Sequence, residues 1–455
     1  MKVFAMPIVA VDRRLKIVTL ISIFVTLFGC AALVFLAHSR GLNPLTLTGD
    51  SKGYVLLAQN LIDHHVFSMS SRAPFELESF RAPGYPTFLA MVFSLFGFTL
   101  ISLFVHALIT SLAPIFLYIL IRPLHEKTAF WASIVFIFEP VRIFLSASFL
   151  SDAFFTTIFL ATLVLVTSVK EGNVLYRSVC TGLLLGACIL VRPIAIFLPL
   201  LFAVYIVYDL RFSKRAFLAG LLVGIGALVA IFPWIYRNHS LFDSWNISSV
   251  GVANLALYNA PEFLKWQPSS AGERLLEQFR AEQARLPHHE ALSLARSDTF
   301  EDTFLEIIRG HELQYMYFHV FKTIPFFITD GLRDTVRLFK IDIGSMPNLS
   351  TAIMNRDFQT FLSYLLSNNI AVVLLVFGST FWASIFVLFV FWALRALVRC
   401  DSIALFLFLI FCDLAALAGP VSIARFRMPV EGLLIASAGL ILFRWYESLR
   451  ETNHS

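Results

Sequence analysis

The sequence predicts an all-α polytopic membrane protein with about ten transmembrane helices. Hydrophobic residues make up 58% of its 455 positions, and only 14% are charged. A soluble domain has roughly a quarter of its residues charged, so most of this chain is expected to lie in lipid. A helix needs about 20 consecutive apolar residues to cross a bilayer, and runs of about this length recur along the chain.

Ten apolar runs are long enough, or nearly so, to span a membrane. They cover residues 17–37, 99–121, 128–149, 153–169, 176–191, 193–208, 216–233, 369–394, 402–418 and 429–443. The run 84–97 is too short to span and is expected to lie as an interfacial helix on the outer side. The segment 313–330 is apolar but contains Lys322, Pro325 and Asp330, so it is either interfacial or a further span. Further spans would bring the total to about 11–13.

Basic residues between the runs predict the orientation, because loops rich in Lys and Arg stay cytoplasmic. The first run is longer than the roughly 7–15 apolar residues of a signal peptide, so an uncleaved span is expected. The basic residues that mark the cytoplasmic side are Lys2, Arg13, Arg14, Lys16, Arg122, Lys127, Lys170, Arg177, Arg211, Lys214, Arg215, Arg395, Arg399, Arg444 and Arg450. With ten spans, both termini lie inside.

Three parts are expected along the chain. Residues 1–233 form a membrane module of about seven spans that includes the first outer loop, 38–98. Residues 234–368 form an extracytoplasmic segment, with interfacial and helical portions, and residues 369–455 form the C-terminal membrane spans.

Several classes of protein lack support in the sequence. It has no Walker phosphate loop, no GxGxxG fingerprint, no HExxH and no GxSxG. Any transferred group is therefore expected to come from a membrane-borne donor. The five cysteines show no CxxC spacing, which predicts neither a zinc site nor a disulfide framework. No basic stripe points to a nucleic-acid partner.

Five arginines lie on the predicted outer side, each near a proline at the edge of an apolar run. They are Arg81 in "FRAPGYP", Arg192 in "LVRPIA", Arg237 in "PWIYRNH", and Arg425 and Arg427 in "SIARFRMPV". Any one of them could simply extend its charge to the lipid headgroups. Guanidinium groups also bind phosphate bidentately, and five on one side favour an outer pocket for a phosphate-bearing lipid.

Two aspartates are expected on the same side. Asp50 opens the amphipathic stretch "TGDSKGYVLLAQNL", and Asp152 lies in "FLSDAFF" between two apolar runs. Counting from Thr128, Asp152 would lie about 36 Å along a continuous helix, at the outer edge of the bilayer core. Each aspartate could cap the helix that follows, which for Asp50 would start at Ser51. Capping is compatible with catalysis, and both acids could face one outer cavity.

Charged and polar residues also occur inside the apolar runs. Pro140 in "FEPVRIF" predicts a kink. Glu139 and Arg142 are three residues apart and could pair on one helix face, either as a structural pair or as part of a site. Asp413 and His106 are either functional groups or hydrogen-bond partners between spans.

An ordered set of short segments carries a resemblance to a known family. The segments are "TGDSKGYVLLAQNL", "FRAPGYPTFLAMVFSLFG", "FLSDAFF", "LVRPIAIFLPL", "FPWIYRNH" and "RFRMPV". In this order the chain resembles the polytopic GT-C glycosyltransferases that use polyprenyl-phosphate sugars. These include the dolichyl-phosphate-mannose protein mannosyltransferases, the bacterial lipid A aminoarabinose transferase and the rhizobial lipopolysaccharide galacturonosyltransferases.

The resemblance implies a membrane glycosyltransferase. It would move a hexose or pentose from a polyprenyl-phosphate donor to a lipid, glycan or protein acceptor on the extracytoplasmic face, inverting the anomeric centre. The expected location is a bacterial inner membrane, with the site facing the periplasm. The resemblance implies Asp50 and Asp152 as catalytic acids and Arg81 as a contact to the donor phosphate. The other outer arginines, Arg192, Arg237, Arg425 and Arg427, join this phosphate-binding set, and further candidates are Tyr54, Tyr85, Glu139 and Arg142.

The chain departs from the family pattern at two positions. Ser51 follows Asp50 where some relatives carry a second acid. Phe80 precedes Arg81 where the aminoarabinose transferases carry a glutamate that binds a metal, and the nearest acids are Glu76 and Glu78. No cofactor is therefore firmly predicted, and a divalent metal stays an open alternative whose expected glutamate ligand is missing.

Two other functions compete with this one. A lipid or solute transporter could use Glu139, Arg142 and Asp413 as a pathway, but it would be expected to show inverted repeats, which the sequence does not reveal. An O-antigen ligase or polymerase would share the outer arginines and the long outer segment. It would not need the ordered segments that carry the resemblance.

Overall fold

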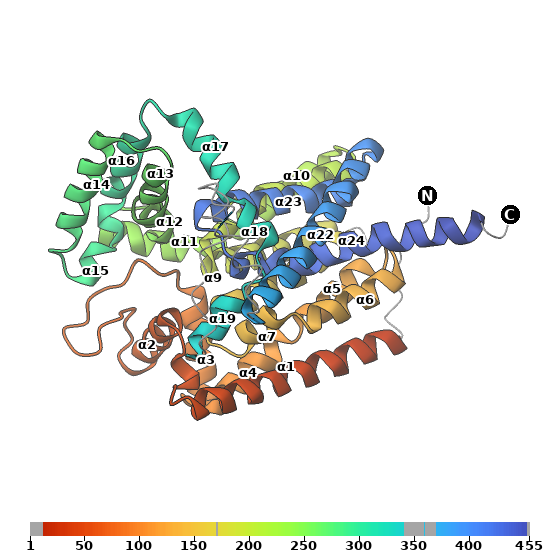
Figure 1. The fold of residues 1–455 in the computed structure, drawn as a ribbon, viewed down its shortest axis with the longest axis horizontal. Helices are drawn as coiled ribbons and strands as arrows, with labels where there is room; N and C mark the ends of the chain where they lie inside the picture. The colour runs from red at the N-terminus through yellow and green to blue at the C-terminus, as the bar shows by residue number, and fades with distance from the viewer. Residues whose placement is uncertain (1–11, 170–171, 341–358, 360–369, 453–455) are drawn as a thin grey trace.

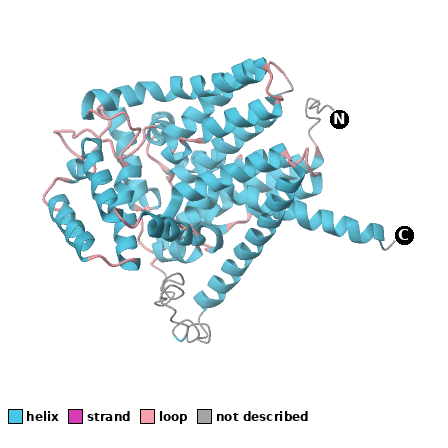
Figure 2. Ribbon diagram, turned by 90° about the horizontal axis from the view of Figure 1, so that it is seen from above, coloured by secondary structure: helices cyan, strands magenta, loops and turns pink. Residues whose placement is uncertain are grey.

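The computed structural model describes residues 12–169, 172–340, 359 and 370–452. These residues form helices joined by loops, with no strand among them (Figures 1 and 2). The predicted all-α class is confirmed. Lys2, Lys170 and the first residue of the run 369–394 lie outside the described residues, and the segment 234–368 is described only to residue 340 and at 359.

Every predicted apolar run is helical where it is described. The helices are α1 (Arg13–Ser39), α4 (Leu100–Thr110) with α5 (Ala113–Ile121), α6 (Glu126–Ile137) with α7 (Pro140–Ser146), α8 (Ser151–Thr167), α9 (Val174–Val191), α10 (Leu198–Asp209), α11 (Lys214–Phe242), α22 (Ile370–Arg399), α23 (Ser402–Ala418) and α24 (Ala424–Thr452). Among the described residues, six helices have the length and composition to cross a membrane, and α6 with α7 makes a seventh if the bent pair is one span. Apolar helices of this kind belong to an integral membrane protein. Since α8, Pro193–Asp209 and α23 are shorter, the count of ten spans stays a prediction.

The predicted break at Pro140 is present, and it changes two expectations. The chain bends by 65° between α6 and α7, and Pro140 occupies the first turn of α7, where a missing N–H costs nothing. The prediction that one continuous helix runs from Thr128 to Asp152 is therefore wrong.

The predicted pairing of the Glu139 and Arg142 side chains is also wrong. The Glu139 carboxylate caps α7 by accepting the Arg142 backbone N–H. The Arg142 guanidinium donates instead to Thr26 Oγ1 at 3.1 Å and to the Ile137 carbonyl at 2.7 Å. No ion pair joins these two described side chains, because the bend gives each a different partner.

Both ends of the chain meet the loop 122–127 at one end of the helices. Arg14 forms an ion pair with Glu126 at 3.2 Å, and Lys127 approaches Glu447 at 3.7 Å. Arg14 and Lys127, which were both predicted to lie on the cytoplasmic side, are therefore at the same end of the molecule. The outer loops lie at the opposite end (Figure 1).

Helices α9 and α11 pack closely through glycines. Gly182 and Gly186 are four residues apart on α9, a spacing that lets helix backbones approach each other in membranes. A Cβ at Gly186 would lie 2.8 Å from the Ala227 carbonyl oxygen, and one at Gly182 would overlap the Val223 backbone of α11. This contact positions α9, which ends at Val191, just before Arg192.

The predicted outer side contains two groups of helices. The first outer loop holds α2 (Gly49–Asp63) and α3 (Gly84–Phe96). The second group comprises α12 (Val250–Asn254), α13 (Ala260–Trp266), α14 (Ser270–Gln283), α15 (His288–Ala291), α16 (Ser297–Ile308) and α17 (Glu312–Lys322), followed by α18 (Ile324–Ile328) and α19 (Leu332–Leu338). Buried side chains such as Phe263, Phe300 and Phe318 give this second group a core of its own. The apolar segment 313–330 is thus two short helices, and neither has the length of a span.

We expect Gly182→Ala to destabilise the protein and Gly224→Ala, its control on α11, to leave stability unchanged or raised. The added methyl at position 182 has no room, and overpacking typically costs about 1–3 kcal/mol. A Cβ at position 224 meets nothing within 4 Å, and Ala favours a helix over Gly by up to about 1 kcal/mol. Thermal unfolding of the purified protein in detergent measures both, and equal melting temperatures would contradict the packing of α9 on α11.

Candidate active site

The start of α2 leaves the Asp50 carboxylate free of capping. Thr48 is the capping residue: its Oγ1 accepts the Ser51 N–H at 3.0 Å, and Ser51 Oγ accepts the Thr48 N–H at 2.9 Å. This reciprocal pair satisfies the exposed backbone donors at the helix start. The expectation that Asp50 caps a helix starting at Ser51 is therefore wrong, because α2 begins at Gly49.

Asp152 does not cap its helix either. Leu150 holds the cap position of α8 without a side-chain hydrogen bond, and Asp152 is in the first turn. A negative charge there is favoured by the unpaired backbone N–H groups at the helix N-terminus. The Asp152 side chain is fully buried, so its charge requires partners within the protein.

Arg425, in the first turn of α24, bridges the two aspartates. Its Nε donates to Asp152 Oδ2 at 2.7 Å, and its Nη1 donates to Asp50 Oδ2 at 2.8 Å. Arg81 Nη2 donates to the remaining Asp50 oxygen at 2.7 Å, and Arg192 Nη1 donates to the remaining Asp152 oxygen. These five residues form one cluster, hereafter the arginine–aspartate cluster, in which each carboxylate oxygen accepts from a guanidinium group.

Tyr54 packs beside this cluster. The Arg81 guanidinium carbon lies 4.7 Å from the centre of the Tyr54 ring, within the range of a cation–π contact. The Tyr54 hydroxyl is 3.2 Å from Ser151 Oγ, which connects α2 to the start of α8. Tyr54 thus contacts both Arg81 and Ser151.

Tyr85 and His106 form a buried network behind the cluster. The Tyr85 ring packs edge-on against Tyr54 with centroids 4.9 Å apart. Its hydroxyl is 3.2 Å from His106 Nε2, and His106 Nδ1 is 3.1 Å from the Ser146 carbonyl oxygen. His106 therefore acts as a hydrogen-bond partner between helices, one of the two roles expected for it.

Two of the five outer arginines lie outside the cluster. Arg237 Nη1 donates to the Glu78 carbonyl at 3.1 Å, and its guanidinium stacks over Trp234 at 4.6 Å. Arg427 is fully buried: its Nε is 3.2 Å from a Glu431 oxygen, and its guanidinium lies 3.7 Å from the Trp382 ring centre. The partners of Arg237 and Arg427 are thus carbonyl, carboxylate and aromatic groups outside the cluster.

A short stretch before Arg81 ties the cluster to the second group of outer helices. The Ser79 carbonyl accepts the Ser249 N–H at 3.1 Å, and Ser79 Oγ accepts the Leu294 N–H at 2.9 Å. Phe80 packs against the core of the outer helices. Sequence reasoning missed Ser79, because a serine with backbone partners far along the chain leaves no local signal.

The charges of the cluster do not cancel. Arg81, Arg192 and Arg425 contribute three positive charges and the two aspartates two negative charges, which leaves a net charge of +1. Burial alone would raise the pKa of the Asp50 carboxyl, but Arg81 and Arg425 outweigh it and hold that pKa well below its usual range. Asp50 is therefore ionised at neutral pH.

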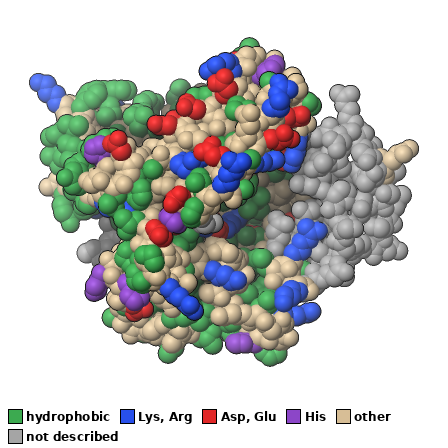
Figure 3. All heavy atoms as spheres, turned by 90° about the vertical axis from the view of Figure 1, so that its left-hand side faces the viewer, with side chains coloured by type: hydrophobic (Ala, Val, Ile, Leu, Met, Phe, Trp, Pro, Cys, Tyr) green, Lys and Arg blue, Asp and Glu red, His purple; other side chains and the backbone are tan. Residues whose placement is uncertain are grey.

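The cluster opens to solvent at Asp50. The Asp50 side chain is 36% exposed, whereas the Asp152 side chain is fully buried. Figure 3 shows this end of the molecule, which is hollowed, with basic and acidic side chains around the hollow. Asp50 is therefore the carboxylate of the cluster that solvent reaches.

The residues of the cluster do not fit a divalent cation. All four carboxylate oxygens already accept from guanidinium groups. Glu78 Oε1 accepts the Ser79 backbone N–H at 3.0 Å, and Glu76 is paired with His289 at 3.3 Å. No group of three His, Cys, Asp or Glu side chains is placed to hold a metal within the described ranges.

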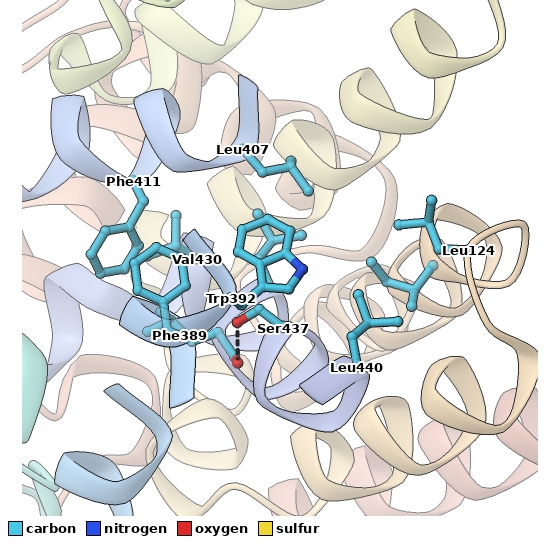
Figure 4. A pocket seen from close by; sticks show the side chains of 11 residues that line it. Leu124, Phe389, Trp392, Leu407, Phe411, Val430, Ser437 and Leu440 are labelled. Carbon is cyan, nitrogen blue, oxygen red and sulfur yellow. Dashed lines mark hydrogen bonds between the residues drawn. The ribbon is translucent and has the colours of Figure 1, made fainter. Parts of the chain in front are cut away.

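A cavity lies away from the cluster, between the end of α5 and helices α22, α23 and α24 (Figure 4). Its volume is about 10 Å³, and it is lined mainly by apolar side chains that include Trp392 and Phe411. A space of that size holds about one water molecule. It is a packing gap and is too small for a sugar.

Residues 80–236 match the family model for dolichyl-phosphate-mannose-protein mannosyltransferases. The predicted GT-C resemblance is confirmed. The matched GT-C stretch contains three members of the cluster, Arg81, Asp152 and Arg192.

One solved structure is also matched. The oligosaccharyltransferase of Archaeoglobus fulgidus, crystallised as a complex with Zn and sulfate, matches with a TM-score of 0.49 and 13% sequence identity. The match covers 96% of this chain and 49% of that one, so the chain spans about half the length of the archaeal protein. No curated protein sequence matches the chain.

We expect Arg425→Gln to reduce stability far more than Arg81→Gln does. Arg425 holds Asp50 and shares the fully buried Asp152 with Arg192; breaking a buried ion pair costs up to about 3–5 kcal/mol, and less where a second cation such as Arg192 remains. Arg81 pairs with the part-exposed Asp50, for which about 1 kcal/mol or less is expected. Melting temperatures of the two variants in the same detergent provide the comparison. Equal losses would contradict the bridging role of Arg425.

Proposed function

We propose that the protein is a membrane glycosyltransferase that uses a polyprenyl-phosphate sugar as its donor. It would transfer a hexose or pentose to a hydroxyl of a lipid, glycan or protein acceptor at the extracytoplasmic face, in a bacterial inner membrane with the site facing the periplasm. The observation that carries the proposal is the arginine–aspartate cluster at the outer end of the helices, with its net charge of +1.

The charge of the cluster suits the donor. A polyprenyl-phosphate sugar is a phosphodiester with one negative charge, which balances the excess of one positive charge. Arg81 has a further donor for it, because its Nε is buried without a hydrogen-bond partner, a rare state for a polar group in a folded protein. We propose that a phosphate oxygen accepts from Arg81 Nε when the donor binds.

The transfer would proceed by a single displacement. The acceptor oxygen forms a bond to the anomeric carbon while the bond from that carbon to the phosphate oxygen breaks, which inverts the anomeric centre. The acceptor proton passes to Asp50, and the polyprenyl phosphate leaves as a monoester with a second negative charge. Arg81 and Arg425 would stabilise that growing charge, as preorganised donors do in a site with few waters.

The same arginines would control the basicity of Asp50. In the free protein they hold the pKa of Asp50 low, which makes it a weak base. If they turn toward the donor phosphate, that restraint weakens and the pKa of Asp50 rises toward its usual value. A general base works better as its pKa approaches the working pH. Donor binding would thereby activate the base.

Asp152 would have a different role. It is fully buried and accepts from both Arg192 and Arg425, so no acceptor hydroxyl reaches it without displacing an arginine. We propose that Asp152 positions Arg425 and takes no proton. The second group of outer helices, which holds the Ser79–Phe80 stretch before Arg81, would cover the site and help to select the acceptor.

We expect Asp50→Asn to lower kcat by about 10²–10⁴-fold, the usual contribution of a general base. Asp63→Asn, at the exposed end of the same helix, is the matched control and should leave kcat unchanged. The assay uses purified protein in lipid with labelled polyprenyl-phosphate sugars and follows both transfer and hydrolysis of the donor. The donor and acceptor sets are screened first with the unaltered protein.

Two results would contradict the proposal at different points. Unchanged turnover by Asp50→Asn would remove Asp50 as the base while leaving the transferase function intact. Absence of turnover by the unaltered protein with every polyprenyl-phosphate sugar, together with no binding of polyprenyl phosphate, would contradict the function itself.

A further inference from the structure

Helix α17 has two apolar faces on opposite sides. One face packs into the core of the outer helices: Phe318 is fully buried and lies 5.4 Å from Phe263, and Tyr315 lies 5.0 Å from Phe304, both between ring centres. Tyr315 and Phe318 are two of the seven apolar side chains of α17.

The opposite face is exposed. It consists of Leu313, Met316, Tyr317 and Val320, which follow the helical spacing of one stripe and are 78%, 64%, 63% and 72% exposed. We call these four residues the α17 stripe. Ile324, the first residue of α18, continues it at 41% exposure. Large apolar side chains grouped in this way mark a surface that contacts a partner or a membrane.

The position of α17 identifies the partner. His319 Nε2 lies 2.8 Å from the Ala416 carbonyl oxygen, near the outer end of α23. The residues that follow these two in the chain, Val320 and Leu417, are both exposed apolar side chains. His319, next to Val320 of the α17 stripe, thus places α17 at the end of the apolar helix α23.

The chain continues from α17 into the short helix α18, which packs against the apolar helices α22 and α23. In α18, Phe326 packs 5.8 Å from Phe411 of α23, and Phe327 packs 4.2 Å from Phe386 of α22. Lys322, the last residue of α17, lies off the stripe and is paired with Glu262 at 3.0 Å. Charge is thus kept away from the exposed stripe and apolar side chains are kept on it.

We infer that the α17 stripe is inserted into the outer leaflet of the membrane. An amphipathic helix in the interface buries its apolar face about 5–10 Å into the boundary between headgroups and acyl chains. Tyr317 suits this depth, because tyrosine is enriched where an apolar ring meets water and headgroups. The stripe anchors the second group of outer helices to lipid beside the spans and so holds it over the arginine–aspartate cluster.

Spin-label accessibility in lipid nanodiscs tests this inference. Single cysteines replace Met316 and Val320 in a chain whose three unburied cysteines, Cys180, Cys400 and Cys412, are changed to serine. Phe377→Cys on α22, which is 74% exposed, provides the lipid-facing control. Gln314→Cys, exposed on α17 but off the stripe, provides the aqueous control.

We expect the labels at 316 and 320 to collide preferentially with oxygen, which concentrates in lipid, as the label at 377 does. The label at 314 should collide preferentially with a water-soluble nickel chelate. Nickel-dominated collisions at 316 and 320 would overturn the inference, because the stripe would then face water. Protection from both reagents would also overturn it, because protein rather than lipid would then cover the stripe. Neither result depends on any transferase assay.

Discussion

The arginine–aspartate cluster depends on one guanidinium group that holds two carboxylates. Arg425 binds Asp50 and Asp152, which belong to different helices far apart in the sequence. Two like charges this close would repel each other, and a buried aspartate without a cation would not stay ionised. The bridge therefore fixes three elements together: the start of α2, the start of α8 and the start of α24. Arg81 and Arg192 complete the arrangement from the first outer loop and the end of α9.

The packing of the helices supports this bridge from behind. Gly84 brings the start of α3 against the backbone of Leu190 and Val191, since a Cβ there would lie 2.7 Å from the Leu190 carbonyl carbon. That approach sets Arg81 near Arg192, each a few residues away along its own segment. Arg427 lies two residues further along α24 and is also stabilised by partners within the protein. Its guanidinium group donates to Glu431 and to the Phe326 carbonyl. The α24 helix thus carries one arginine for the cluster and another for its own anchoring.

Much of this arrangement could be predicted from the sequence, for physical reasons that also explain the failures. Long hydrophobic runs predict helices that lie in lipid. The basic residues in the loops predict that both ends of the chain lie on the same side of the membrane. The sequence also indicated that Asp50, Asp152 and several arginines share the outer side. It could not separate Arg425 from Arg427. Residues two positions apart on a helix, such as Arg425 and Arg427, point about 200° apart around its axis. Arg425 therefore faces the cluster while Arg427 faces the interior.

The local chemistry at helix starts was harder to read. A cap can come from Thr48 as readily as from Asp50, and only the backbone shows which side chain accepts the N–H groups. The Glu139–Arg142 pair failed because a helix break at Pro140 gave each residue a different partner. Ser79 left no signal at all, since its partners Ser249 and Leu294 lie in a distant segment. Contacts between distant segments are the part that local pattern does not encode.

The most direct measurement of the central claim is a structure of the protein in lipid nanodiscs with a non-transferable polyprenyl phosphonate sugar. The account predicts phosphonate oxygens within about 2.7–3.2 Å of Arg425 and Arg81 nitrogens. It also predicts that Asp50 releases at least one guanidinium partner while Asp152 keeps Arg192. A phosphonate bound elsewhere, with Arg425 still bridging both aspartates, would contradict it.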